Sequence, residues 1–368
     1  MGFKCGIVGL PNVGKSTLFN ALTQTAAAQA ANYPFCTIEP NVGDVAVPDS
    51  RLDELVKISH SKEIIPTRLT FVDIAGLVRG ASKGEGLGNQ FLANIRDCDA
   101  VAFVARCFEV GDIIHVEGRV DPLDDLDIIE TELMLADLES LEKRVPNLEK
   151  RAKAGSDKES AKTLELVNLA LAELREGRPA RAAYPKVSRE DDKAWWMLQL
   201  LTALPALYVC NVDEGSAGEG NSLSARVSER AAKDGASSVV ISAKIESEIA
   251  MLEADERAEF LETLGLHEPG LNRLIHEAYK LLGLQTYFTV GPKEARAWTI
   301  PAGATAPQAA GVIHTDFEKG FIRAQVIAYD DYIQCGGEQG AKDAGKMRTE
   351  GKDYIVKDGD LMNFLFNV

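Results

Sequence analysis

A glycine-rich segment near the start of the chain has the residue types and spacing of a phosphate-binding loop. Residues 9–17 read Gly-Leu-Pro-Asn-Val-Gly-Lys-Ser-Thr and fit the pattern G-x-x-x-x-G-K-[ST] between an apolar run and a helix-like stretch. The glycines let backbone N–H groups surround phosphate oxygens, Lys15 offsets the charge of the β- and γ-phosphates, and Ser16 can bind Mg²⁺. We expect Lys15 to be catalytic. The nucleotide contacts expected from this loop are Asn12, Val13, Gly14, Lys15, Ser16 and Thr17.

Three further motifs stand in the order expected of a GTPase-class nucleotide site. Residues 73–76 (Asp-Ile-Ala-Gly) end a predicted strand, where Asp73 supports Mg²⁺ through a water molecule and the Gly76 N–H senses the γ-phosphate. Thr37 lies between the first predicted helix and the second strand, where its hydroxyl would complete the magnesium ligands. Residues 242–244 (Ser-Ala-Lys) follow the last strand of the series, where backbone groups touch the base; we expect nucleotide contacts from Ser242 and Ala243. We predict catalytic roles for Thr37 and Gly76.

The base is expected to be read by residues 211–214, Asn-Val-Asp-Glu, in the place where guanine-binding proteins have N-K-x-D. Val212 replaces the lysine, and Glu214 carries its carboxylate one methylene further out than the aspartate that accepts both guanine N–H groups. A bidentate pair worth about 1–3 kcal/mol tolerates such a shift poorly. The amide of Asn211 could pair with the adenine edge. We predict base contacts from Asn211, Val212 and Glu214 and a preference for ATP; a GTPase with relaxed base specificity is the alternative.

The hydrolytic machinery is incomplete, because Leu77 stands where Ras-like enzymes place the glutamine that orients the attacking water. Two groups could compensate. A potassium ion held partly by Asn12 would supply positive charge, and His115 could reach the γ-phosphate if its loop folds over the site. We expect slow hydrolysis. A regulatory module whose ATP occupancy is the signal is therefore a second alternative.

Short apolar runs alternate with helix-length segments through much of the chain, which predicts a mostly parallel sheet covered by helices on both faces. This is the doubly wound α/β fold of a P-loop NTPase. The predicted strands lie at residues 3–8, 42–47, 69–72, 100–105, 207–210 and 238–241.

An insertion and a C-terminal domain complete the expected organisation. Apolar residues follow a heptad-like spacing at residues 134–152 and again at 160–174, which predicts an antiparallel helical hairpin. Alternating strands and glycine-rich turns from residue 283 predict a separate α+β domain. The predicted domains are residues 1–128 and 203–282 for the nucleotide domain, 129–202 for the helical coiled-coil insertion and 283–368 for the C-terminal domain.

The composition excludes several classes of protein. The 40 basic and 56 acidic residues give a net charge of −16, which excludes a chain coated with cations for wrapping DNA. The expected hairpin tip is nevertheless locally basic, with seven basic and three acidic residues between Lys143 and Lys162. No apolar run is long enough to span a membrane, and the scattered cysteines indicate reduced thiols. We expect a cytoplasmic monomer with no membrane or sequence-specific DNA partner.

Together the motifs resemble the YchF/Obg-like ATPase family, and the match runs nearly end to end. It includes residues 34–41 (Pro-Phe-Cys-Thr-Ile-Glu-Pro-Asn) and the glycine-rich stretch from Asp73 to Asn89. The region from Leu284 resembles a TGS domain of the β-grasp type. The resemblance implies an ATP-binding domain, magnesium at Ser16 and Thr37, and base contacts around Asn211. It also implies association with the ribosome (70S or large subunit), to which the basic hairpin tip could contribute by contacting rRNA phosphates.

Overall fold

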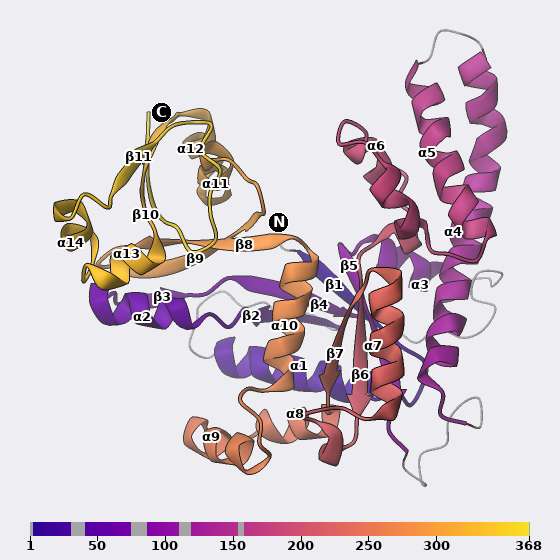
Figure 1. Ribbon diagram of the computed structural model, residues 1–368, viewed down its shortest axis with the longest axis horizontal. Coiled ribbons are helices and arrows are strands. Elements are labelled where there is room, and N and C mark those ends of the chain that lie inside the picture. Colours follow the sequence, from indigo (N-terminus) through magenta and orange to yellow (C-terminus); the bar gives the residue numbers. More distant parts are fainter. Residues whose placement is uncertain (1–2, 31–40, 75–86, 110–118, 154–157, 368) are drawn as a thin grey trace.

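The computed structural model describes residues 3–30, 41–74, 87–109, 119–153 and 158–367, and the statements below concern these residues. They form a central nucleotide domain from which a helical arm and a C-terminal domain project on opposite sides (Figure 1).

The nucleotide domain is built on a six-stranded sheet in the order β2-β4-β1-β5-β6-β7, in which only β2 runs antiparallel to its neighbour. Every residue of β5 and β6 is buried, as expected of central strands covered on both faces. This confirms the predicted doubly wound α/β architecture. The strands are β1 (Lys4–Val8), β2 (Val42–Ala46), β4 (Arg68–Asp73), β5 (Ala100–Cys107), β6 (Ala206–Val212) and β7 (Ser237–Ile241).

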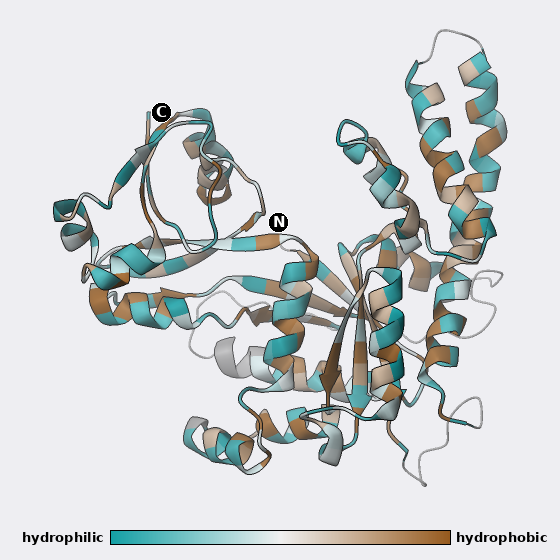
Figure 2. Ribbon diagram, in the orientation of Figure 1, coloured by the Kyte–Doolittle hydropathy of each residue, from teal (hydrophilic) through white to brown (hydrophobic). Residues whose placement is uncertain are grey.

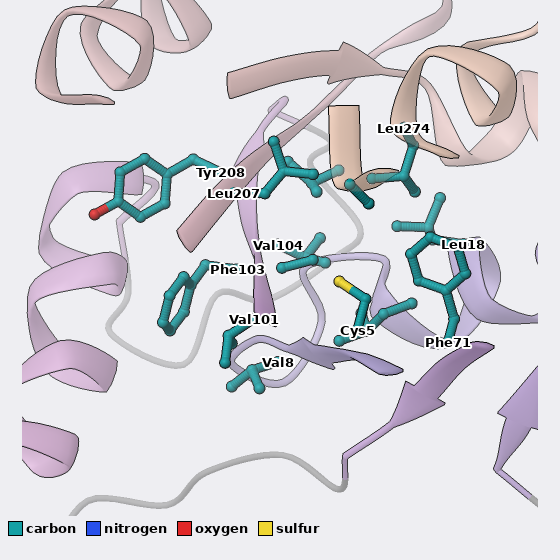
Figure 3. Close-up of a cluster of buried hydrophobic side chains, with 14 of the residues drawn as sticks. Cys5, Val8, Leu18, Phe71, Val101, Phe103, Val104, Leu207, Tyr208 and Leu274 are labelled. Carbon is teal, nitrogen blue, oxygen red and sulfur yellow. The ribbon is translucent and has the colours of Figure 1, made fainter. Parts of the chain in front are cut away.

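Helices cover this sheet and close its core. Figure 3 shows side chains of the buried cluster, among them Leu18 from α1, Phe71 from β4 and Leu274 from α10. The helices of the domain are α1 (Lys15–Ala30), α3 (Leu87–Arg96), α7 (Ser222–Asp234), α8 (Ala243–Ile249), α9 (Ala254–Thr263) and α10 (Gly270–Leu281). No helix in the described parts of the chain combines the length and apolar character needed to cross a lipid bilayer.

The helical arm is formed by α4 (Pro122–Lys153) and α5 (Lys158–Arg175), which lie side by side as the heptad spacing predicted (Figure 1). The start of α4 packs in the core of the nucleotide domain, whereas Leu141 and the residues beyond it pack against α5. The predicted boundary at residue 129 therefore falls inside one continuous helix. The chain returns through η1 (Ala180–Lys186), α6 (Asp192–Trp196) and η2 (Leu201–Ala203).

Buried carboxylates fix the base of the arm. Asp137 of α4 accepts hydrogen bonds from the backbone N–H groups of Leu201 (2.9 Å) and Thr202 (2.8 Å) and from the Thr202 hydroxyl. Two helical turns earlier, Glu130 pairs with Arg181 and accepts a hydrogen bond from Tyr208 of β6 (3.1 Å). The arm is therefore attached to the central sheet by specific polar contacts as well as by packing. Figure 2 shows that its far end is largely hydrophilic.

The C-terminal domain contains a second six-stranded sheet in the order β11-β10-β12-β8-β9-β3. Its own core lies under α11 and includes Tyr287, Ala310 and Phe364. The elements are β8 (Leu284–Val290), β9 (Glu294–Pro301), α11 (Ala306–Ile313), α12 (Thr315–Lys319), β10 (Phe321–Ile327), α13 (Tyr329–Gln334), α14 (Glu338–Asp343), β11 (Arg348–Glu350) and β12 (Leu361–Phe366).

One strand of that sheet, β3 (Glu63–Ile65), comes from the N-terminal half of the chain. It pairs in parallel with β9, with Ile64 opposite Ala295. The preceding helix α2 (Ser50–Ser59) packs on the same sheet, where Leu52 and Leu55 share a core cluster with Phe288. The predicted division placed residues 50–65 in the nucleotide domain, but they pack in the C-terminal one. We call α2 and β3 the excursion, because the chain leaves the first sheet after β2 and rejoins it at β4.

Candidate nucleotide-binding site

The carboxyl ends of the parallel strands β1, β4, β6 and β7 meet at one edge of the first sheet, where α1 begins. The loop of residues 9–14 lies there and makes a tight turn, with Gly14 at φ +90°. A Cβ atom on Gly14 would come within 2.1 Å of the Asn211 amide nitrogen, so backbone conformation and packing both require glycine. The predicted phosphate loop therefore has the strand–loop–helix context that its chemistry needs.

Lys15 and Asp73 meet at this edge, although 58 positions separate them in the chain. The Lys15 ammonium donates to the Asp73 carboxylate, and their side chains are 11% and 16% exposed. Each neutralises the other where the loop would receive phosphates. The phosphates of a bound triphosphate can replace Asp73 as the partner of the Lys15 ammonium. The Asp73 carboxylate is then available to a hydrated cation.

Asn211, at the end of β6, connects three parts of the site. Its buried amide donates to the Val13 carbonyl (2.8 Å) and accepts from the Ala243 N–H (2.9 Å). The phosphate loop is thus joined to the start of α8 through one side chain. The structure gives Asn211 a bracing contact that its motif did not reveal, and its direct contact with the base stays a prediction.

Replacing Asn211 with alanine should destabilise the protein and weaken nucleotide binding together. The variant removes the partner of the Val13 carbonyl and of the Ala243 N–H, both of which are buried. The loss should lower the free energy of unfolding by about 1–3 kcal/mol. Chemical denaturation and calorimetric titration with a non-hydrolysable ATP analogue measure the two effects. Asn168→Ala, at an exposed position of α5, is the matched control. An Asn211→Ala protein as stable as this control would contradict the bracing role.

Glu214, at the start of η3 (Glu214–Ser216), forms an ion pair with Lys244 of α8 at 2.7 Å. The carboxylate raises the pKa of Lys244 through a hydrogen bond and through its charge. Val212 and Ser242 are buried, and the Ser242 hydroxyl has no hydrogen-bond partner among the described residues. The structure therefore gathers the residues predicted for the base (Asn211, Val212, Glu214, Ser242 and Ala243) at one edge. Lys244 was predicted only as part of the backbone loop near the base, and no role was predicted for its side chain.

Candidate metal ligands lie beside the Lys15–Asp73 pair. Ser16 is exposed in the first turn of α1, and the Asp73 carboxylate is held nearby. Hydroxyl and carboxylate oxygens are the donors that Mg²⁺ prefers. Asn12, the predicted potassium ligand, is exposed and has a left-handed φ of 65°.

Four positions of interest lie outside the described residues: Thr37, Gly76, Leu77 and His115. The described ends next to two of these segments are in contact, because the Asp73 N–H donates to the Asn41 carbonyl (2.8 Å). The catalytic roles of Thr37, Gly76 and His115 stay predictions.

Comparisons with known proteins agree with this geometry. A family model described as "50S ribosome-binding GTPase" matches residues 4–145, and the YchF-GTPase_C model, described as "Protein of unknown function (DUF933)", matches residues 284–367. Proteins named "Ribosome-binding ATPase YchF" match over all of this chain and all of their own length, at 60% identity in Haemophilus influenzae, 59% in Escherichia coli O157:H7 and 52% in Bacillus subtilis. The chain belongs to the YchF family.

A solved structure supports membership of the YchF family along the whole length. The Schizosaccharomyces pombe YchF GTPase is 37% identical, covers 99% of this chain and 98% of its own, and superposes with a TM-score of 0.87. A GTP-binding protein from Pyrococcus horikoshii, at 20% identity and a TM-score of 0.62, shares the fold. The names of these YchF relatives disagree on the nucleotide, since some say ATPase and one says GTPase.

Proposed function

We propose that this YchF-family protein is a P-loop ATPase that binds and slowly hydrolyses ATP and associates with the ribosome as a nucleotide-dependent switch. The observation that carries the proposal is the Lys15–Asp73 pair beside the phosphate loop. The names of the full-length relatives, which say ribosome-binding ATPase, support the ribosome as the partner and ATP as the nucleotide. We further propose that it works in the cytoplasm. The monomeric state, the TGS assignment and the lack of a sequence-specific DNA partner stay predictions.

Magnesium is the proposed metal, held by Ser16 and Thr37 and contacted by Asp73 through water. It would offset charge on the β- and γ-phosphates, while Lys15 and the loop N–H groups orient them. The exposed Asn12 supports a place for potassium beside the phosphates. Hydrolysis is slow in this proposal because Leu77 has no group that can orient water.

Calorimetric titration should find that the protein binds ATP at least about tenfold more tightly than GTP, or about 1.4 kcal/mol. The reason is that the Glu214 side chain is one methylene longer than aspartate and its carboxylate is paired with Lys244, so it is poorly placed to accept both guanine N–H groups. Each titration uses the magnesium complex of a non-hydrolysable analogue. GTP binding tenfold tighter than ATP would replace the proposal with that of a GTPase.

The far end of the helical arm is the proposed rRNA contact. Three of the seven basic residues near the predicted tip have partners within the arm region: Lys143 pairs with Glu139, Lys162 pairs with Asp191, and Arg144 donates to the Leu198 carbonyl. We propose that the contact is made by the exposed basic residues at the ends of the two helices, which are nearest to the tip in sequence. These are Lys150, Arg151 and Lys153 of α4 and Lys158 of α5.

Changing Lys150, Lys153 and Lys158 together to glutamate should reduce co-sedimentation with 70S ribosomes and make it less dependent on salt. Each lysine–phosphate contact that is lost lowers the slope of log affinity against log salt concentration by close to one, because about one counterion fewer is released on binding. The control carries the same three changes at exposed Lys57, Lys233 and Lys280. Equal co-sedimentation of both variants and the wild type would exclude the arm tip as the anchor.

A further inference from the structure

Lys244 occupies a position from which it can influence which base the protein accepts. It is the second residue of α8, and the N–H of the residue before it is held by Asn211, which also holds the phosphate loop. From there its Nζ reaches Oε1 of Glu214 at 2.7 Å. The pair bridges the end of β6 and the start of α8, the two segments assigned to the base.

The chemistry of the two purines makes such a pair discriminating. Guanine presents two adjacent donors, N1–H and N2–H₂, and a carboxylate reads both only when each of its oxygens is free. Adenine has no such pair of donors, so its binding does not require Glu214 to be free. An ammonium group on Oε1 therefore competes with guanine and leaves adenine unaffected.

We propose that Lys244 is a specificity-determining residue that disfavours guanine by occupying the Glu214 carboxylate. The inference rests on the proposed nucleotide site and adds a residue to it. It assigns the selectivity to a pair of side chains, in addition to the extra methylene of Glu214. Lys244 acts through Glu214, so it is a positioning residue.

The size of the effect follows from the exposure of the pair. The Lys244 and Glu214 side chains are 66% and 50% exposed, which places the pair among surface ion pairs. Competition from such a pair changes an equilibrium by up to about fivefold. Salt screens it, so the preference against GTP should narrow as ionic strength rises.

The experiment measures dissociation constants for non-hydrolysable analogues of ATP, GTP and ITP with the full-length protein. Lys244→Met removes the charge and keeps the aliphatic stem, and Lys244→Arg keeps the charge. ITP is informative because inosine has N1–H but lacks the N2 amine. The wild type should bind GTP and ITP equally weakly, whereas Lys244→Met should bind GTP up to about fivefold more tightly than the wild type and more tightly than ITP. The affinity for ATP should not change.

Three further results test the same point. Lys244→Arg should behave as the wild type, the added change Glu214→Gln should remove the gain for GTP, and the Lys244→Met variant should lose the salt dependence of the ATP-to-GTP ratio. If the wild type and Lys244→Met bind ATP but share one ATP-to-GTP ratio and one GTP-to-ITP ratio, the inference is wrong and the proposed function stands. If the wild type binds no ATP, the proposed function fails, and the inference fails with it.

Discussion

Replacing Lys15 with alanine should lower ATP turnover by at least about a hundredfold, which is the effect of removing one preorganised charge from a transition state. Lys15 lies where the phosphate loop meets the first helix, and we propose that the ammonium that now pairs with Asp73 meets the γ-phosphate when nucleotide binds. A neutral side chain leaves the negative charge that develops on the phosphates without this partner. Single-turnover hydrolysis measures the chemical step directly.

Two controls separate lost chemistry from lost folding. Lys62→Ala removes an exposed lysine at a distance from the loop and should hydrolyse ATP as the wild type does. Thermal denaturation of Lys15→Ala should show a folded protein, because Asp73 keeps some contact with solvent. Turnover by a folded Lys15→Ala protein within a factor of about three of the wild type would contradict the catalytic role of Lys15.

Replacing Leu55 with alanine should lower the free energy of unfolding by about 2–5 kcal/mol and destabilise both sheets together. Leu55 is fully buried, and its cluster joins helix α2 to Phe288 and Leu361 of the C-terminal domain. A polar contact also joins the excursion to the C-terminal domain, since Arg51 of α2 pairs with Asp358 at 2.6 Å. The excursion therefore contributes to the core of the C-terminal domain, although both of its ends are connected to strands of the nucleotide domain.

Urea denaturation followed by hydrogen exchange resolves which regions open. We expect protection to fall in parallel in β4, next to the excursion, and in β9, which pairs with it. Leu135→Ala is the matched control, because that leucine is 42% exposed on α4 and its truncation should change stability by less than about 0.5 kcal/mol. Loss of protection confined to the C-terminal domain would show that the two sheets unfold independently.

Local patterns predicted the elements with strong periodicity. The apolar runs at residues 100–105 and 207–210 became fully buried strands, and the heptad spacings of residues 134–152 and 160–174 became the facing sides of α4 and α5. The phosphate loop was also predictable, because its glycines, Lys15 and Ser16 are neighbours in the chain. In each case the information lies within a few residues of the feature.

Features that depend on distant partners were not predictable. The strand β3 has three residues, Glu63–Ile65, and its identity comes from pairing with β9 more than two hundred positions later. Asn211 shows the same limit for a side chain, since its amide meets the Val13 carbonyl 198 positions away. Nothing in a local motif specifies which backbone group a buried amide will find.

The pairing of β3 with β9 sets an order of events during synthesis of the chain. Residues 63–65 leave the ribosome about 230 residues before their partners at 294–296, which at 5–20 residues per second is a wait of roughly 10–50 s. In that interval Leu52 and Leu55 of the excursion lack the sheet that buries them in the finished protein. A nascent or truncated chain therefore exposes an apolar surface that chaperones and proteases can recognise, and only the complete chain removes that surface.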